Sequence, residues 1–78
     1  MKNIKKYTEA FVQAFEVDES TVFNLEYESI QEWDSVGHMM LIAELEGAFD
    51  IMMEMEDIID FSSFERGKEL LKKYDVVM

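Results

Sequence analysis

Residues 33–38, with the sequence WDSVGH, place a carboxylate and a hydroxyl directly before a long run of apolar residues at helical spacing. Asp34 and Ser35 are both suited to the N-cap of this helix, because a short side-chain oxygen there accepts a hydrogen bond from a free backbone N–H. The other interpretation of Ser35 is a point of covalent attachment through its hydroxyl. The local chemistry leaves both uses open.

Helical periodicity predicts an all-α fold with four helices around this segment. The helix after Asp34 runs from Ser35 to Phe49, whereas residues 17–34 lack periodicity and are expected to form a long loop with a few apolar anchors. A first helix with an aromatic stripe is expected from about Asn3 to Glu16, and the loop anchors are Val22, Leu25, Tyr27 and Ile30. A short third helix is expected within 52–59. A fourth helix is expected from 61–63 to about Tyr74, with Ser62 and Glu65 at capping-box spacing.

The second helix has two apolar faces when its residues are placed about 100° apart around the axis. One face is wide enough for the core and comprises Leu41, Ile42, Leu45, Ala48 and Phe49, with His38 at its edge. The opposite face, here called the outer strip, consists of Val36, Met40, Ala43 and Gly47. Because a surface helix is usually polar on its outer side, either the first or the fourth helix covers this strip or a partner protein docks on it.

Several neighbouring residues have mainly structural interpretations. Trp33 is expected to anchor the end of the loop in the core, since large aromatic side chains dominate core burial. His38 has no second histidine or cysteine at ligand spacing, which favours capping or packing over metal binding. Gly37 either lets another chain approach closely or tolerates crowding in the first turn. The methionines at 52, 53 and 55 either fill gaps in a small core or form a deformable pocket.

The motif around Ser35 resembles the signature of acyl and peptidyl carrier proteins. The resemblance lies in Asp34-Ser35-Val36, in the following residues 41–46 (LIAELE) and in Phe49-Asp50, and it extends over nearly the whole chain. It implies a single carrier domain over residues 1–78, folded as a small four-helix bundle of acyl-carrier type with a long first loop and a short third helix. It also implies a 4′-phosphopantetheine arm on Ser35, with Asp34 assisting recognition by the transferase. Val36 is a departure, because the family usually has leucine there.

The resemblance further implies a carrier without catalytic activity of its own, which holds an acyl or aminoacyl group as a thioester. Its partners would be a phosphopantetheinyl transferase, a loading enzyme and downstream transferases, with basic or apolar docking patches. The expected docking residues are Val36, Met40, Ala43, Glu44, Glu46 and Gly47. Met40 and Gly47 stand where carriers of fatty acid synthesis commonly have acids, so a free-standing carrier in a specialised biosynthetic pathway is expected. Carriers of this type can shelter an acyl chain between the second and third helices. In that case the methionines at 52, 53 and 55 would form a deformable pocket for the acyl chain.

The charge distribution restricts the partners. The net charge is −11, and the interval from Tyr7 to Glu65 contains no Lys or Arg but 16 of the 18 acidic residues. Nucleic acid and anionic membranes are therefore poor partners, whereas a protein with a basic patch is a good one. The alternative function is a small acidic helical interaction protein, either a nucleic-acid mimic or an adaptor, which would have no use for Ser35.

Other classes lack their characteristic residues. No segment has the alternating acids, glycine and final glutamate of a calcium-binding loop, and one isolated histidine does not make a Ser/His/acid set. The chain has no cysteine, no run of about 20 apolar residues, and a basic N-terminus that continues into polar residues instead of an apolar stretch. A soluble, cytoplasmic monomer without a secretion signal and without a bound metal is expected.

Overall fold

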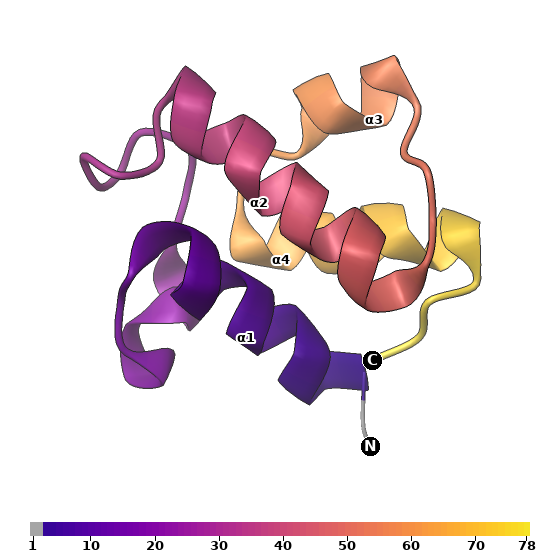
Figure 1. Cartoon of the computed structure of the whole chain (residues 1–78), viewed down its shortest axis with the longest axis horizontal. Coiled ribbons are helices and arrows are strands. Elements are labelled where there is room, and N and C mark those ends of the chain that lie inside the picture. Colours follow the sequence, from indigo (N-terminus) through magenta and orange to yellow (C-terminus); the bar gives the residue numbers. More distant parts are fainter. Residues whose placement is uncertain (1–2) are drawn as a thin grey trace.

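The computed structural model describes residues 3–78 and is helical throughout its regular regions (Figure 1). Met1 and Lys2 of the basic N-terminal segment lie outside the described residues. The elements are α1 (Asn3–Phe15), η1 (Glu19–Asn24), α2 (Ser35–Phe49), α3 (Met55–Asp60), α4 (Phe64–Leu71) and η2 (Lys72–Tyr74), of which η1 and η2 are 3₁₀ helices. Residues 3–78 contain no strand, only an isolated antiparallel bridge between Glu26 and Ser63. The all-α prediction is confirmed, whereas an arrangement of acyl-carrier type stays a prediction.

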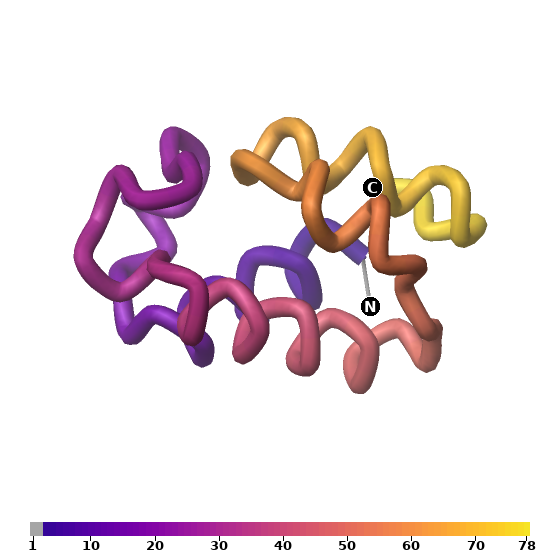
Figure 2. Tube along the Cα trace, turned by 90° about the horizontal axis from the view of Figure 1, so that it is seen from above, coloured from indigo at the N-terminus to yellow at the C-terminus, as the bar shows by residue number. Residues whose placement is uncertain are grey.

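The core is an aromatic cluster between the helices. Helices α1 and α2 lie side by side, and α3 and α4 lie on the other side of the molecule (Figure 2). The stripe predicted on α1 is confirmed, because Tyr7, Phe11 and Phe15 are fully buried. Trp33 is buried as predicted, with ring centroids 5.6 Å from Phe11 and 5.1 Å from Phe15. Such aromatic pairs contribute about 0.5–1.5 kcal/mol each beyond the area they bury, so Trp33 fixes the residues before α2 firmly in place.

The connection between α1 and α2 wraps around one end of the molecule and is pinned to the start of α4 (Figure 1). The predicted anchors Val22 and Leu25 are buried, whereas Tyr27 is 40 % exposed and Ile30 is half-buried. Two backbone hydrogen bonds join this connection to α4, from Phe64 N–H to Leu25 O at 3.0 Å and from Tyr27 N–H to Ser62 O at 2.8 Å. The 3₁₀ turn η1 was not predicted.

These backbone contacts also correct the predicted start of α4. The N-cap is Ser63 and not Ser62, because the Ser63 hydroxyl accepts a hydrogen bond from Arg66 N–H at 2.9 Å. The carbonyl of Ser62 is bound to the α1–α2 connection, which holds that residue in the extended segment before the helix. The capping-box spacing therefore identified the correct region with a register error of one residue.

The end of α2 sets the position of α3. Asp50 has a left-handed backbone conformation (φ 54°, ψ 52°), and Ile51 N–H donates to Glu46 O at 3.1 Å, a common way to terminate a helix. The Glu46 carboxylate then accepts a hydrogen bond from Met53 N–H at 2.9 Å. The chain is thereby turned back toward the first half of α2, where α3 begins at Met55 after the predicted loop.

Candidate modification site and adjoining groove

Ser35 is the first residue of α2, and its hydroxyl is free of any capping role. The N-cap is Asp34, whose Oδ1 accepts a hydrogen bond from Gly37 N–H at 2.8 Å and whose carbonyl accepts one from His38 N–H at 2.8 Å. No hydrogen bond within residues 3–78 uses the Ser35 hydroxyl, and the residue is exposed. Of the two candidates for the cap, the carboxylate is used and the hydroxyl remains accessible to a reagent or an enzyme.

Close packing against the preceding loop fixes this helix start. A Cβ on Gly37 would lie 1.8 Å from the carbonyl oxygen of Glu32 and 3.3 Å from the Phe15 ring. Gly37 is buried, so the crowding predicted for the first turn comes from the protein itself. The loop end and the first turn of α2 therefore form one rigid unit that carries Ser35 on its surface.

His38 connects this unit to α3. The indole Nε1–H of Trp33 donates to His38 Nδ1 at 2.9 Å, and His38 Nε2 lies 2.7 Å from the carbonyl oxygen of Ile58. The two rings stack with an interplanar angle of 16°. His38 is buried and packs as predicted, and its two hydrogen bonds join the loop end, α2 and α3 at one point.

An apolar groove of about 410 Å³ begins beside Ser35 and lies between α2 and α3. Tyr27, Ser35, His38 and Ser62 supply its polar atoms, and the rest of the wall consists of Met39, Met55, Ile58, Ile59 and Phe61. None of these side chains carries a carboxylate or an ammonium group. We call this hollow the Ser35 groove, and its volume falls within the range of small-molecule sites.

The methionines take different positions around this groove. Met53 is buried in the core, Met55 lines the groove and is 69 % exposed, and Met52 is 87 % exposed. The core-filling interpretation is confirmed for Met53, whereas a deformable pocket around Met55 stays a prediction. Met39 was missed as a groove residue, although its position four residues after Ser35 places it on the same helical face.

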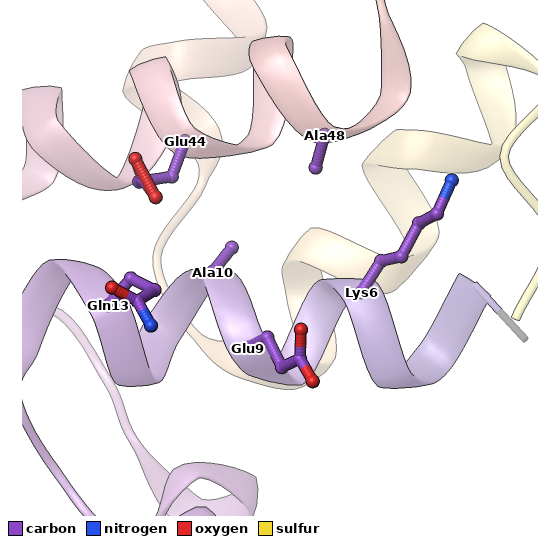
Figure 3. Close-up of a pocket in the computed structure, with 6 residues that line it drawn as sticks. All are labelled: Lys6, Glu9, Ala10, Gln13, Glu44 and Ala48. Atoms are coloured by element: carbon purple, nitrogen blue, oxygen red, sulfur yellow. The ribbon is translucent and has the colours of Figure 1, made fainter. Parts of the chain in front are cut away.

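A second hollow lies between α1 and α2, away from Ser35 (Figure 3). It measures about 200 Å³ and is lined by Lys6, Glu9, Ala10, Gln13, Glu44 and Ala48. The prediction that Ala48 belongs to the core face of α2 is wrong, because Ala48 is exposed at this hollow, where the small side chain of Ala10 on α1 leaves the space between the two helices unfilled. Its small volume and charged lining make it a weaker candidate than the Ser35 groove.

The outer strip of α2 is uncovered. Val36 is 67 % exposed and Met40 is 52 % exposed, and Ala43 and Gly47 are exposed as well. The interpretation in which α1 or α4 covers this strip is therefore wrong, and its use in docking stays a prediction. Of the two acids expected at its flanks, Glu44 is exposed, whereas Glu46 is half-buried and its carboxylate holds the backbone of Met53.

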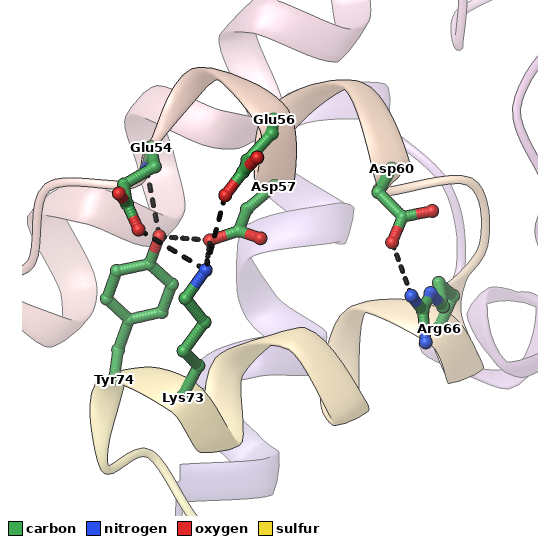
Figure 4. A network of polar contacts seen from close by, with 7 residues as sticks. All are labelled: Glu54, Glu56, Asp57, Asp60, Arg66, Lys73 and Tyr74. Atoms are coloured by element: carbon green, nitrogen blue, oxygen red, sulfur yellow. Dashed lines mark hydrogen bonds and ion pairs between the residues drawn. The ribbon is translucent and has the colours of Figure 1, made fainter.

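Helix α3 is fastened to η2 by a polar network (Figure 4). The Tyr74 hydroxyl donates to Asp57 Oδ2, and Lys73 Nζ lies 2.9 Å from the same oxygen and 3.2 Å from Glu54 Oε1. The hydrogen bond from Tyr74 and the Lys73 ammonium lower the pKa of the Asp57 carboxyl, and Asp57 in turn raises the pKa of Lys73. Arg66 forms a further ion pair with Asp60 at the end of α3.

Residues 3–78 hold no group of three or more His, Asp or Glu side chains that could bind a metal ion. In the same part of the chain, every helix is too short or too polar to span a bilayer. Comparison with known proteins found no matching family model, no matching curated protein and no matching solved structure.

Proposed function

We propose that this chain is a free-standing carrier protein, with a 4′-phosphopantetheine arm attached to the Ser35 hydroxyl and no catalytic activity of its own. The observation that carries the proposal is an exposed serine hydroxyl without a hydrogen-bond partner, at the first residue of α2 and at the edge of an apolar groove. The motif resemblance to acyl and peptidyl carriers supports the same assignment, as do the short α3 and the long α1–α2 connection, which fit a four-helix bundle of acyl-carrier type.

The residues around Ser35 suit a phosphodiester. Asp34 satisfies the N–H groups of Gly37 and His38, which leaves the N–H groups of Ser35 and Val36 at the N-terminus of α2 for an anion. The arm would supply a terminal thiol that holds the cargo as a thioester. Asp34 would remain beside the attachment point as a recognition feature for the phosphopantetheinyl transferase, and the outer strip with Glu44 would contact the loading and downstream enzymes.

The groove favours an apolar acyl cargo over an aminoacyl cargo. Its wall has five apolar side chains and no carboxylate that would bind the ammonium group of an amino acid. A buried ammonium without such a partner would be costly. We therefore propose a cargo with a hydrocarbon portion that lies between Met39 of α2 and the apolar residues of α3.

Intact mass measurement tests the attachment. The chain is treated with coenzyme A, magnesium and a broad-specificity phosphopantetheinyl transferase, and the mass is expected to increase by one phosphopantetheine group. Ser35→Ala should gain nothing, whereas Ser62→Ala, which changes another exposed serine of the same groove, should be modified like the parent. An unmodified parent, or a modified Ser35→Ala variant, would refute the proposal and favour the acidic interaction protein.

The cargo class is tested on the same modified protein. An arm loaded with a medium-length saturated acyl chain should raise the melting temperature, because the groove binds part of that chain. An arm loaded with an alanyl group should leave the melting temperature at the value of the unloaded form. Equal effects of the two cargoes would contradict an apolar preference without affecting the attachment to Ser35.

A further inference from the structure

Thioether sulfur is the group in this chain that a mild peroxide oxidises most readily. The chain contains seven methionines and no cysteine, and its one tryptophan is fully buried. Four of the methionines are more than half exposed, and these are Met39, Met40, Met52 and Met55. Met53 is buried. Because a peroxide must reach a sulfur to oxidise it, the four exposed sulfurs are open to oxidation and that of Met53 is protected.

Two of the exposed sulfurs belong to the wall of the Ser35 groove. Met39 lies on α2 and Met55 is the first residue of α3, so each of the two helices that enclose the groove supplies one thioether. Met40 and Met52 are not part of this wall. Oxidation at Met39 or Met55 therefore changes the lining of the groove, whereas oxidation at Met40 or Met52 changes only the surface outside it.

We propose that Met39 and Met55 are modification sites, at which hydrogen peroxide converts the thioether to a sulfoxide and thereby weakens the binding of apolar ligands in the Ser35 groove. In this reaction the sulfur lone pair attacks one peroxide oxygen, an S–O bond forms and the O–O bond breaks. The hydrogen on the attacked oxygen passes to the other oxygen, which leaves as water. Sulfur loses two electrons and the peroxide gains them.

The charges near the groove favour an uncharged oxidant. The net charge of the chain is −11, and neither α2 nor α3 contains a Lys or Arg. Lys73 reaches α3 from η2, but its ammonium is paired with Asp57 and Glu54. An anionic oxidant is therefore repelled from this part of the surface. Hydrogen peroxide carries no charge at neutral pH and approaches both sulfurs without that penalty.

A sulfoxide makes the groove wall less suited to an apolar ligand. The thioether is apolar and flexible, so it adapts to the shape of what it contacts, whereas the sulfoxide is polar. A ligand that covers the sulfoxide oxygen removes its water, and the apolar wall residues Ile58, Ile59 and Phe61 have no side-chain donor to replace it. The fold should persist, because Met39 and Met55 are more than half exposed and the buried Met53 stays reduced.

Peptide mapping by mass spectrometry shows which sulfurs react. The full chain without an arm on Ser35 is used, since neither sulfur needs the arm in order to be oxidised, and it is exposed to hydrogen peroxide for increasing times. Met39 and Met55 should each gain one oxygen about tenfold faster than Met53. Fragmentation of the peptides separates neighbouring methionines in the sequence.

Fluorescence of Nile red, an uncharged apolar dye, measures binding in the groove. Oxidation of the parent should weaken dye binding about fivefold. A double variant with Met39→Leu and Met55→Leu keeps the apolar wall without its sulfurs, so its affinity should be the same before and after peroxide treatment. The matched control combines Met40→Leu with Met52→Leu, which removes two exposed sulfurs outside the groove, and it should lose affinity like the parent.

A measurement on the parent alone gives a decision even where a leucine variant does not fold. The two methionine sulfoxide reductases, one for each sulfoxide epimer, should restore dye binding to the oxidised parent. The proposal is overturned if Met39 and Met55 react as slowly as Met53, if the reduced parent does not bind the dye, or if its affinity survives oxidation. Loss of affinity in the Met39 and Met55 double variant, its absence in the control variant, or failure of the reductases to restore binding once the added oxygen is removed would refute it equally.

Discussion

The Tyr74 hydroxyl donates a hydrogen bond to the Asp57 carboxylate, which joins the 3₁₀ turn η2 to the middle of α3 across 17 residues of sequence (Figure 4). The same hydroxyl accepts a hydrogen bond from Glu54 N–H at 2.8 Å. One side chain near the C-terminus therefore holds both the start and the middle of the helix that forms one wall of the Ser35 groove.

Tyr74→Phe should lower the free energy of unfolding by about 1–2 kcal/mol, because two hydrogen bonds are lost while the ring is kept. Chemical denaturation gives this value. Lys72→Gln is a suitable control, since the Lys72–Glu69 ion pair is more than half exposed on both sides and should contribute little to stability. Parent-like stability of Tyr74→Phe would mean that the network does not hold α3.

Acid should weaken the same network through Asp57. The hydrogen bond from Tyr74 and the Lys73 ammonium lower the pKa of Asp57 in the folded state, whereas an aspartate in the unfolded chain titrates near about 3.9. The stabilisation is therefore fully present above about pH 4 and is lost as the pH falls through the lower folded pKa.

Asp57→Asn tests this pH dependence. The variant should be less stable than the parent at neutral pH, and the difference should shrink as the pH falls below about 4. Denaturant titrations at several pH values measure the difference, and Glu44→Gln on the exposed face of α2 serves as the control. A difference that stays constant down to the acid-unfolded state would contradict the assigned role of Asp57.

Replacement of two glycines of α2 by alanine should change the stability of the protein in opposite directions. Gly37→Ala places a methyl group 1.8 Å from the Glu32 carbonyl and should destabilise the protein by at least about 2 kcal/mol. Gly47→Ala meets nothing within 4 Å and should stabilise α2 by about 0.5–1 kcal/mol, as alanine does in an exposed helix interior. Thermal or chemical denaturation of the pair measures both effects. Equal effects in the two variants would show that the loop does not pack closely on the first turn.

Periodicity predicted the helices well, because the side chains that define α1 and α2 repeat every three or four residues and their burial is set by that repeat. The candidate site was predicted only in its local part, the Asp34–Ser35 start of α2. The contacts of His38 with Ile58 and of Asp57 with Tyr74 join residues 20 and 17 positions apart, and they depend on where the turn at Asp50 sends the chain. No local pattern encodes that direction. The cap of α4 was misplaced by one residue for a similar reason, because the long-range hydrogen bond from Tyr27 N–H to the Ser62 carbonyl sets where the helix begins.

Met40 is the central residue of the outer strip and lies about one turn beyond Ser35. Met40→Glu should change the free energy of unfolding by less than about 0.5 kcal/mol, because the side chain is 52 % exposed. If partner enzymes dock here, the same change should slow the enzyme that loads the phosphopantetheine arm, since an apolar contact is replaced by a charge that must be desolvated.

Met53→Glu is the matched control for this prediction. Met53 is 7 % exposed, so an unpaired carboxylate there should cost several kcal/mol of stability. This variant gives the loss of stability expected if a glutamate is introduced at a core position. Chemical denaturation and a loading assay on both variants separate folding from docking. A stable Met40→Glu variant that is loaded at the rate of the parent would remove the outer strip from the docking surface, and a large loss of stability would mean that the strip is not free in solution.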